Sequence, residues 1–428
     1  MDFSLPADLK AYLDELDAFI EAEIRPLERQ DDNVRFFDHR REHARTDWDN
    51  QGLPRQEWED LLKQAVRRAD AAGHWRFSAP KKYGGRDGSN LWMAVIREHF
   101  AAQGLGLHND LQNEHSIVGN FPFVEMYEQF GTDAQKEEFI LGGFSGERRV
   151  AFGLTEPDHG SDATHMETRG VPEERDGVPG FRLNGRKMWI TGMHKATHCA
   201  VFARTSGNDG DARGISCFLT PADQLQIDDY IWTFNMPTDH PRLTIENVWV
   251  PESALLGPPG GGLALAQSFV HQNRIRQAAS SLGAAVYCIE ESVRYARTRK
   301  PFGEPLSQNQ AIQFPLVELA TQAEMLRWLI RKTAWDMDNM PHKEIEKTIS
   351  DKVSMCNYWA NRLCCEAADR AMQVHGGIGY SREKPFEHIY RHHRRYRITE
   401  GAEEIQMRKV GAYLFGYLGP RRETLGKL

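Results

Sequence analysis

The sequence has no long apolar run. None of its hydrophobic stretches approaches the roughly 20 residues that a membrane-spanning helix needs. The N-terminal residues Met1–Ser4 open an acidic amphipathic segment and lack both the basic start of a secretory signal and the Arg-rich, acid-poor character of a transit peptide. The C-terminal residues Gly426–Leu428 are only loosely similar to a peroxisomal signal. These absences predict a cytoplasmic protein without a membrane span.

Positive charge is also not in excess. The formal net charge is −8 at pH 7, whereas a protein that binds nucleic acid normally presents a basic surface. The one basic cluster, Arg391–Arg397, is local in an acidic chain. We interpret it as structural or as a group that steers a phosphate, and we expect no nucleic-acid partner.

Two further absences concern cofactors. The six cysteines form no C-x-x-C pair and no metal-ligand spacing, which predicts reduced thiols and no metal site. No G-x-G-x-x-G follows a strand and opens a helix, because Gly104–Gly106 and Gly377–Gly379 lack the third glycine and the βαβ setting. The sequence therefore argues against a Rossmann fold, and a dinucleotide would have to be held in another way.

What the sequence does contain is a hydrophobic period that changes twice along the chain. Helical spacing marks residues 6–28, 57–71, 92–102 and 134–141, short alternating runs fill 150–250, and helical stripes return after Gly257–Gly262. Long stripes such as Ile275, Ala279, Leu282 and Leu316, Leu319, Ala323 predict a near-parallel bundle. We therefore expect an α+β fold with an N-terminal helical domain (1–148), a central β-barrel or sheet domain (149–256) and a C-terminal four-helix bundle (257–428).

Within the β region, Asn184–Gly185 separates two apolar runs. Asn-Gly favours a two-residue hairpin turn, because both turn positions take positive φ. The sequence thus predicts a hairpin at this dipeptide, with further strands at Ala200–Ala203, Ile215–Leu219 and Leu243–Val250.

Two segments of the β region carry the strongest functional signal. Gly153–Asp162 (GLTEPDHGSD) is a loop rich in hydroxyls and small residues, and Lys187–Thr191 (KMWIT) ends a strand with an aromatic and a hydroxyl. A flat aromatic cofactor needs an indole face for stacking and short polar groups for its ring edge. Either segment alone could be an ordinary strand and loop. Together and in this order, they resemble the signature of the acyl-CoA dehydrogenases, flavoenzymes that desaturate acyl thioesters.

The resemblance covers nearly the whole chain, and the helical–β–helical order is also that of this family. The resemblance also includes the segments Arg299–Gly303, Ser307–Gln310 and Gln373–Tyr380. From the residues alone, an arginine can neutralise a pyrophosphate and glycines allow close backbone approach, although a glycine C-cap also explains the last segment. The resemblance implies that FAD is contacted within the subunit by Leu154, Thr155, Ser161, Trp189 and Thr191, across a subunit boundary by Arg299 and Phe302, and further by Gln310, Gln373, Gly376, Gly377, Ala402 and Glu404. A site completed by a second chain implies a homo-oligomer, a dimer or a tetramer.

The segment Ile398–Gln406 is similar to the family's E-G-T-x-E/Q-I-Q motif, and Glu400 matches its catalytic base. A carboxylate can remove the α-proton of a thioester, and burial would raise its pKa and make it a better base. An alternative is that Glu400 is an acid near the start of a helix at Ala402–Leu414 that favours the helix dipole. Some relatives carry the base just before the arginine matched by Arg274, but this chain has Asn273 there, which cannot serve. The resemblance implies substrate contacts from Ser161, Arg274, Glu400 and Gly401.

The chain departs from the family pattern in four places, one of which is His392, where an aspartate commonly follows the residue matched by Arg391. His159 and His165 replace small residues, and could narrow a channel, contact a phosphate or point to solvent. Ala402 replaces a threonine, which removes a hydroxyl near FAD. The run His108–His115 is polar where relatives line the distal acyl pocket. It suggests a polar, branched or ring-bearing acyl group, although surface exposure of these side chains is an alternative.

The sequence thus predicts an FAD-dependent oxidoreductase that converts an acyl-CoA to a trans-2-enoyl-CoA. Glu400 would abstract the α-proton while the β-hydride passes to flavin N5, and an electron-transfer flavoprotein would accept the electrons. Two alternatives remain open. One is a flavin oxidase or monooxygenase on the same fold, and the other is a non-catalytic paralogue that binds FAD or acyl-CoA.

Overall fold

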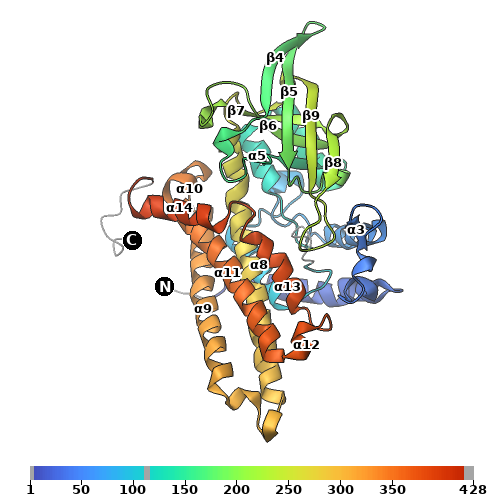
Figure 1. Cartoon of the computed structure of the whole chain (residues 1–428), viewed down its shortest axis with the longest axis vertical. Helices are drawn as coiled ribbons and strands as arrows, with labels where there is room; N and C mark the ends of the chain where they lie inside the picture. Colours follow the sequence, from blue (N-terminus) through green and yellow to red (C-terminus); the bar gives the residue numbers. More distant parts are fainter. Residues whose placement is uncertain (1–3, 110–115, 419–428) are drawn as a thin grey trace. The chain divides into compact units, whose positions relative to one another are not determined.

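The computed structural model describes residues 4–109 and 116–418 (Figure 1). Its internal contacts group these residues into two compact units. The first contains residues up to Ala44, Glu57–Asn120 and the chain from His271 onward, and the second contains Arg45–Gln56 and Phe121–Val270. The C-terminal Gly426–Leu428 and residues 110–115 of the polar run lie outside the described residues. The division at residues 148/149 and 256/257 stays a prediction.

The first unit is helical. Its helices are α1 (Ala7–Phe19), α2 (Arg25–Arg29), α3 (Gln56–Ala71), α4 (Asn90–Ala102), α8 (Gly262–Thr298, which begins in the second unit), α9 (Gln310–Asp338), α10 (His342–Thr348), α11 (Ser350–His375), α12 (Gly377–Tyr380), α13 (Phe386–Tyr396) and α14 (Glu403–Leu414). A π-helical turn, Ile20–Ile24, joins α1 to α2.

The predicted stripes form the core of this unit. Leu282 of α8, Leu326 of α9 and Leu363 of α11 are all buried in one hydrophobic cluster. Helix α11 packs against α9 and α13 (Figure 1), and residues of α8 and α13 belong to the same hydrophobic cluster as those of α9 and α11. Burial of a 3.6-residue apolar face supplies most of the stability of such helices. The prediction of a C-terminal helical bundle is confirmed.

The second unit is built on an eight-stranded sheet. Its strands are β3 (Val150–Gly153), β4 (Arg169–Arg175), β5 (Val178–Met188), β6 (His198–Arg204), β7 (Ile215–Pro221), β8 (Gln226–Tyr230), β9 (Pro241–Pro251) and β10 (Leu255–Leu256). They pair in the order β10-β7-β6-β4-β5-β9-β8, and β3 pairs with β6. The unit also contains β1 (Thr46–Asp47), β2 (Leu53–Pro54), α5 (Pro122–Phe130), α6 (Asp133–Lys136) and α7 (Gly142–Ser145).

The predicted hairpin turn at Asn184–Gly185 is wrong. Strand β5 runs through this dipeptide, and the turn lies earlier, at Asp176–Gly177, where both residues have positive φ (52° and 78°). The register between β5 and β9 shifts after Leu183, so Asn184–Gly185 marks a bulge. A side chain at position 185 would place its Cβ 2.3 Å from Thr168 Oγ1, which explains the glycine without a turn.

Two findings concern membrane-spanning helices and the cysteines. No helix among the described residues combines the length and the apolar character that a bilayer crossing requires. All six cysteines are free and buried, and burial raises the pKa of the Cys199 thiol to about 12.

Candidate functional site

The predicted cofactor residues of the second unit lie where β3 and β5 end. Leu154 and Thr155 follow β3, and the Met188 N–H donates to the Thr155 carbonyl at 2.9 Å, which joins the two segments. Trp189 follows β5 with a φ of +64° and leaves 46% of its surface exposed. The Thr191 hydroxyl lies 3.1 Å from His240 Nδ1. The structure therefore brings an exposed indole and short polar groups together at the C-terminal ends of β3 and β5.

A buried ion pair that the sequence did not reveal connects the end of β5 to the loop after β3. Lys187 Nζ donates to Glu156 Oε1 at 2.9 Å and to the Leu154 carbonyl at 3.2 Å, and the two charged side chains are 0% and 3% exposed. The Glu156 carboxylate also accepts from the backbone N–H groups of Glu167 and Thr168. Burial alone would raise the pKa of Glu156, but the Lys187 charge and these hydrogen bonds outweigh it and lower that pKa.

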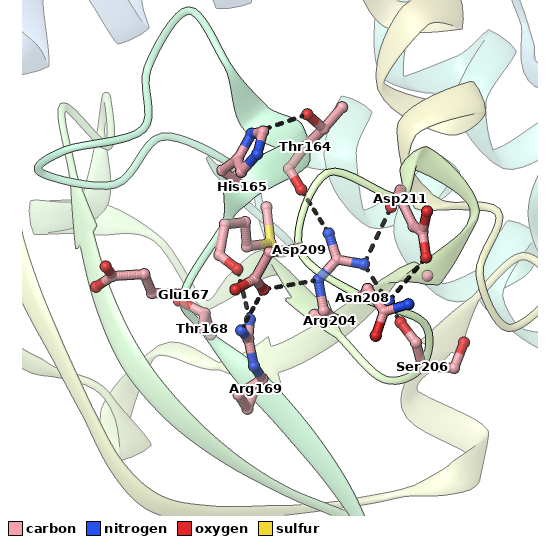
Figure 2. Close-up of polar contacts among 12 residues, drawn as sticks. Thr164, His165, Glu167, Thr168, Arg169, Arg204, Ser206, Asn208, Asp209 and Asp211 are labelled. Carbon is pink, nitrogen blue, oxygen red and sulfur yellow. Dashed lines mark hydrogen bonds and ion pairs between the residues drawn. The ribbon is translucent and has the colours of Figure 1, made fainter.

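Hydrogen bonds from Arg204 fix the loop that contains His159, Ser161 and His165. Figure 2 shows these bonds beside Thr164 and His165. The guanidinium of Arg204, which is 4% exposed, donates to the carbonyls of Thr164 (2.5 Å) and Asp211 (3.0 Å). These bonds tie the loop after β3 to the loop between β6 and β7.

The two loop histidines lie beside carboxylates. His165 Nδ1 is 2.7 Å from Asp162 Oδ2, and His159 Nε2 is 3.6 Å from Glu167 Oε1. His165 is about half exposed, so of the three predicted arrangements, orientation towards solvent describes it best.

In the first unit, Glu400 lies on the short connection between α13 and α14. Its φ is +57° and that of Gly401 is +92°, and a non-glycine residue with left-handed backbone is uncommon and concentrates at functional sites. Helix α14 begins at Glu403, and its first turn contains Glu403 and Glu404. Glu400 therefore precedes the helix, and the acids of the first turn are other residues.

Side chains from neighbouring helices hold the backbone of this connection. Arg274 of α8 donates from Nε (3.0 Å) and Nη2 (2.6 Å) to the Glu400 carbonyl. Gln406 of α14 donates to the Gly401 carbonyl at 2.7 Å. Arg274 is 6% exposed, so its predicted role in substrate binding remains a prediction, while its observed partners are protein atoms.

Behind these contacts is a buried amide network. Asn357 of α11 donates to the Arg274 carbonyl at 2.9 Å and accepts from Gln406 at 3.0 Å. Asn361 extends the network to Ser281, whose hydroxyl lies 2.8 Å from His393 Nδ1. Burial lowers the pKa of His393 to about 3, so its ring is neutral. Since an unpaired buried amide is costly, this network fixes the arrangement of α8, α11 and α14.

The remaining predicted cofactor residues lie at helix ends: Arg299 and Phe302 follow α8, Gln310 begins α9, Gln373, Gly376 and Gly377 lie at or after the end of α11, and Ala402 and Glu404 lie at the start of α14. Tyr295 stacks on His375 with ring centroids 4.3 Å apart, which brings the ends of α8 and α11 together. Phe302 has a φ of +57° and a fully exposed side chain, and Arg299, Gln310 and Gln373 are exposed as well. A Cβ added to Gly376 or Gly377 would meet no heavy atom within 4 Å. These groups leave room for a ligand that is close to the backbone.

Comparison with known proteins identifies the family. The acyl-CoA dehydrogenase N-terminal, middle and C-terminal domain models match residues 6–147, 151–247 and 260–415. The chain belongs to the acyl-CoA dehydrogenase family. It is therefore an oxidoreductase of that family with its helical and sheet architecture, as the sequence predicted.

Individual relatives of this chain carry names of different activities. A 3-(aryl)acrylate reductase from Clostridium sporogenes is 32% identical over 362 residues, which are 83% of this chain and 91% of that protein. Subunit CarC of the caffeyl-CoA reductase-Etf complex from Acetobacterium woodii is 29% identical over 80% of this chain and 87% of that protein. The structure of butyryl-CoA dehydrogenase from Megasphaera elsdenii aligns with a TM-score of 0.76 and 27% identity, covering 97% of this chain and all of that one.

The residues present in this chain fit a bound FAD. An exposed indole at Trp189 suits a flat ring, and the open backbone at Gly376 and Gly377 with the cation of Arg299 suits a pyrophosphate. Among the described residues, no cluster of three or more His, Cys, Asp or Glu side chains could hold a metal ion.

The first residues of the predicted acyl-pocket run are buried. His108 is fully buried with Nε2 3.2 Å from the Phe100 carbonyl, and burial lowers its pKa to about 3. Asn109 is 4% exposed. Surface exposure, the alternative for this run, is wrong for these two residues, and Asp110–His115 lie outside the described residues.

Proposed function

We propose that this protein is an FAD-dependent dehydrogenase that converts an acyl-CoA to a trans-2-enoyl-CoA, with Glu400 as the base. The supporting observation is the left-handed backbone of Glu400, held through its carbonyl by Arg274. Such a conformation costs of order 1–3 kcal/mol and persists where surrounding contacts impose it. Here it would direct the carboxylate to the α-proton, while the Glu400 backbone N–H would donate to the thioester oxygen, which becomes more negative as that proton leaves.

FAD, when bound, supplies a hydride acceptor for the β-carbon. Leu154, Thr155, Ser161, Trp189 and Thr191 would hold its flavin side, with further contacts from Ala402 and Glu404. Gln310, Gln373, Gly376 and Gly377 would also contact it, and Arg299 and Phe302 would reach the FAD of a neighbouring subunit.

An exposed apolar face on α9 supports the proposed homo-oligomer. Phe314, Val317, Met325, Trp328 and Trp335 recur at helical spacing and are 38–61% exposed. Large exposed apolar faces usually mark protein–protein contacts. We propose that a second copy of the chain covers this face in a dimer or tetramer.

Charges on this face should therefore dissociate the oligomer. Val317→Glu combined with Met325→Glu should give monomers with a lower FAD content, because burying two unpaired carboxylates is unfavourable. Sedimentation velocity and the flavin-to-protein absorbance ratio measure both effects. Glu318→Gln on the same helix is the control and should leave the assembly intact. A double variant with the wild-type sedimentation coefficient would show that another surface forms the assembly.

An anaerobic titration tests the proposed reaction. Butyryl-, octanoyl- and palmitoyl-CoA, together with cyclic and aryl-bearing thioesters, should be added to the purified yellow protein while flavin absorbance is recorded. We expect at least one thioester to bleach the flavin, and the polar character of the 108–115 run favours a polar, branched or ring-bearing acyl group. A preference for plain alkyl chains would reject this substrate class, and no bleaching by any thioester would reject the reaction.

The electron acceptor needs a separate measurement. We propose an electron-transfer flavoprotein, and similarity to a subunit of a reductase-Etf complex supports it. Turnover that requires such an acceptor would distinguish a dehydrogenase from an oxidase, which would form hydrogen peroxide in air.

Similarity to the 3-(aryl)acrylate reductase favours one second candidate, the same chemistry in the reductive direction. Glu400 would then deliver a proton to the α-carbon of an enoyl thioester. Reoxidation of the chemically reduced protein by cinnamoyl-CoA, faster than desaturation of 3-phenylpropionyl-CoA, would support this direction.

A further inference from the structure

A neutral amide lies beside the Glu400 carboxylate. Asn273 of α8 is 7% exposed, and its Nδ2 is 3.4 Å from Glu400 Oε1. This distance is long for a hydrogen bond, but hydrogen bonds at catalytic groups are often long without substrate and shorten when substrate binds. The amide is adjacent in sequence to Arg274, which holds the Glu400 carbonyl. Consecutive residues of α8 thus contact the backbone and the side chain of the same glutamate.

The orientation of the Asn273 amide follows from its other partners. Arg276 Nη1 donates to Asn120 Oδ1, and a guanidinium can only donate. The Asn120 amide therefore presents its oxygen to Arg276 and its nitrogen to Asn273, whose Oδ1 it meets at 2.9 Å. With its oxygen engaged, Asn273 presents its NH₂ group to Glu400. Hydrogen-bond donation therefore runs in one direction, from Arg276 through Asn120 and Asn273 to the Glu400 carboxylate. We call this chain of hydrogen bonds the relay.

We propose that Asn273 is a positioning residue for Glu400, and that Asn120 and Arg276 set the direction of its amide. The inference rests on the proposed role of Glu400 as the base. A donor at Oε1 fixes the rotamer of the carboxylate and stabilises its ionised form, the form that accepts a proton. The relay thereby favours the ionised form of Glu400 and fixes the direction of its carboxylate.

Three substitutions test the relay in the FAD-loaded enzyme. Asn273→Ala removes the donor, and Asn273→Asp replaces it with an isosteric like charge. Asn120→Asp changes a residue that does not contact Glu400 in this relay, but an acceptor there would favour reversal of the Asn273 amide. We expect kcat to fall about tenfold in Asn273→Ala and further in Asn273→Asp, with a fall in the same direction in Asn120→Asp, because a hydrogen bond to a charged group has about this effect.

The measurements separate positioning from general damage. KM for the fastest thioester of the panel should change less than about twofold, because the substrate contacts remain. The kinetic isotope effect from α-deuterated substrate should rise, and deuterium incorporation at the α-carbon from D₂O, which reports proton abstraction directly, should slow. Rates are expressed per bound flavin, so partial loss of folded protein does not alter them. Asn339→Asp, which removes an amide donor to the Trp335 carbonyl at the exposed end of α9, is the control.

The outcomes distinguish this inference from the proposed function. If Glu400→Gln retains normal bleaching, the base is another residue and the relay has no catalytic role. If Glu400→Gln blocks bleaching but all three asparagine variants retain the wild-type kcat and isotope effect, Glu400 is the base and only the relay is wrong. A fall in kcat for Asn273→Ala without a fall for Asn120→Asp would overturn the assigned direction of donation.

Discussion

Glu400→Gln should retain bound FAD but reduce the rate of flavin bleaching by an acyl-CoA about 10³-fold. Glutamine has nearly the same shape as glutamate and can keep the contact with Asn273, but it cannot accept the α-proton. General-base catalysis contributes roughly 10²–10⁴-fold. Because Arg274 holds the backbone carbonyl, the left-handed connection should survive the substitution. Stopped-flow absorbance under anaerobic conditions measures the effect.

Glu366→Gln is the matched control for this variant. Glu366 lies on the exposed surface of α11, where loss of one carboxylate should leave the rate unchanged. The visible flavin spectrum and the thermal midpoint of both variants should equal those of the wild type. Normal bleaching by Glu400→Gln would contradict the assignment of the base, whereas loss of the yellow colour would show that Glu400 serves cofactor binding instead.

Lys187→Met should destabilise the second unit by about 3–5 kcal/mol, the usual cost of removing one partner from a buried ion pair. The Glu156 carboxylate would stay buried with two backbone donors but without its cation. The Leu154 carbonyl would also lose a donor. Urea denaturation, followed by the fluorescence of the tryptophans, measures the loss. Weaker FAD binding should accompany it, because Leu154 and Thr155 form the proposed flavin side of the site.

A second substitution shows whether the buried charge causes the loss. Adding Glu156→Gln to Lys187→Met removes the unpaired carboxylate and should restore a share of the stability. Lys136→Met is the control, because the Asp133 side chain that Lys136 pairs with is fully exposed and such pairs contribute about 0–1 kcal/mol. Equal destabilisation by Lys136→Met and Lys187→Met would mean that burial of the pair has no special effect.

The sequence predicted the helical stripes well because a helix repeats its buried face many times. Leu319, Leu326 and Ile330 each report the same orientation of α9, so an error at one position has little effect. A turn is specified by two residues only. Asn184–Gly185 has the composition of a hairpin turn, but pairing along the whole of β5 and β9 decides the register, and the dipeptide became a bulge.

The contacts of the candidate site were less accessible to sequence reasoning. Asn120, Asn273 and Glu400 are separated by 153 and 127 positions respectively, and no periodic pattern relates such residues. Lys187 gave no clear signal, because Arg182, Asn184 and Arg186 also lie in β5 and only the structure shows that Lys187 is the buried charge that needs a partner. Its partner Glu156 lies in the same loop motif as Leu154, and nothing in the motif indicated that this glutamate is buried or paired with Lys187.

The length of helix α8 has a consequence for oligomers that contain both normal and altered chains. About 25 residues separate Asn273 from its end at Thr298, or roughly 38 Å at 1.5 Å per residue. Asn273 and Arg274 in the first half of this helix contact Glu400, the proposed base of the same subunit. The helix then leads to Arg299 and Phe302, which in the proposed oligomer serve the neighbour. An altered copy of the residues after α8 therefore impairs a centre that it does not itself contain. In a proposed pair of one normal and one altered chain, the centre of the normal chain should fail and that of the altered chain should work.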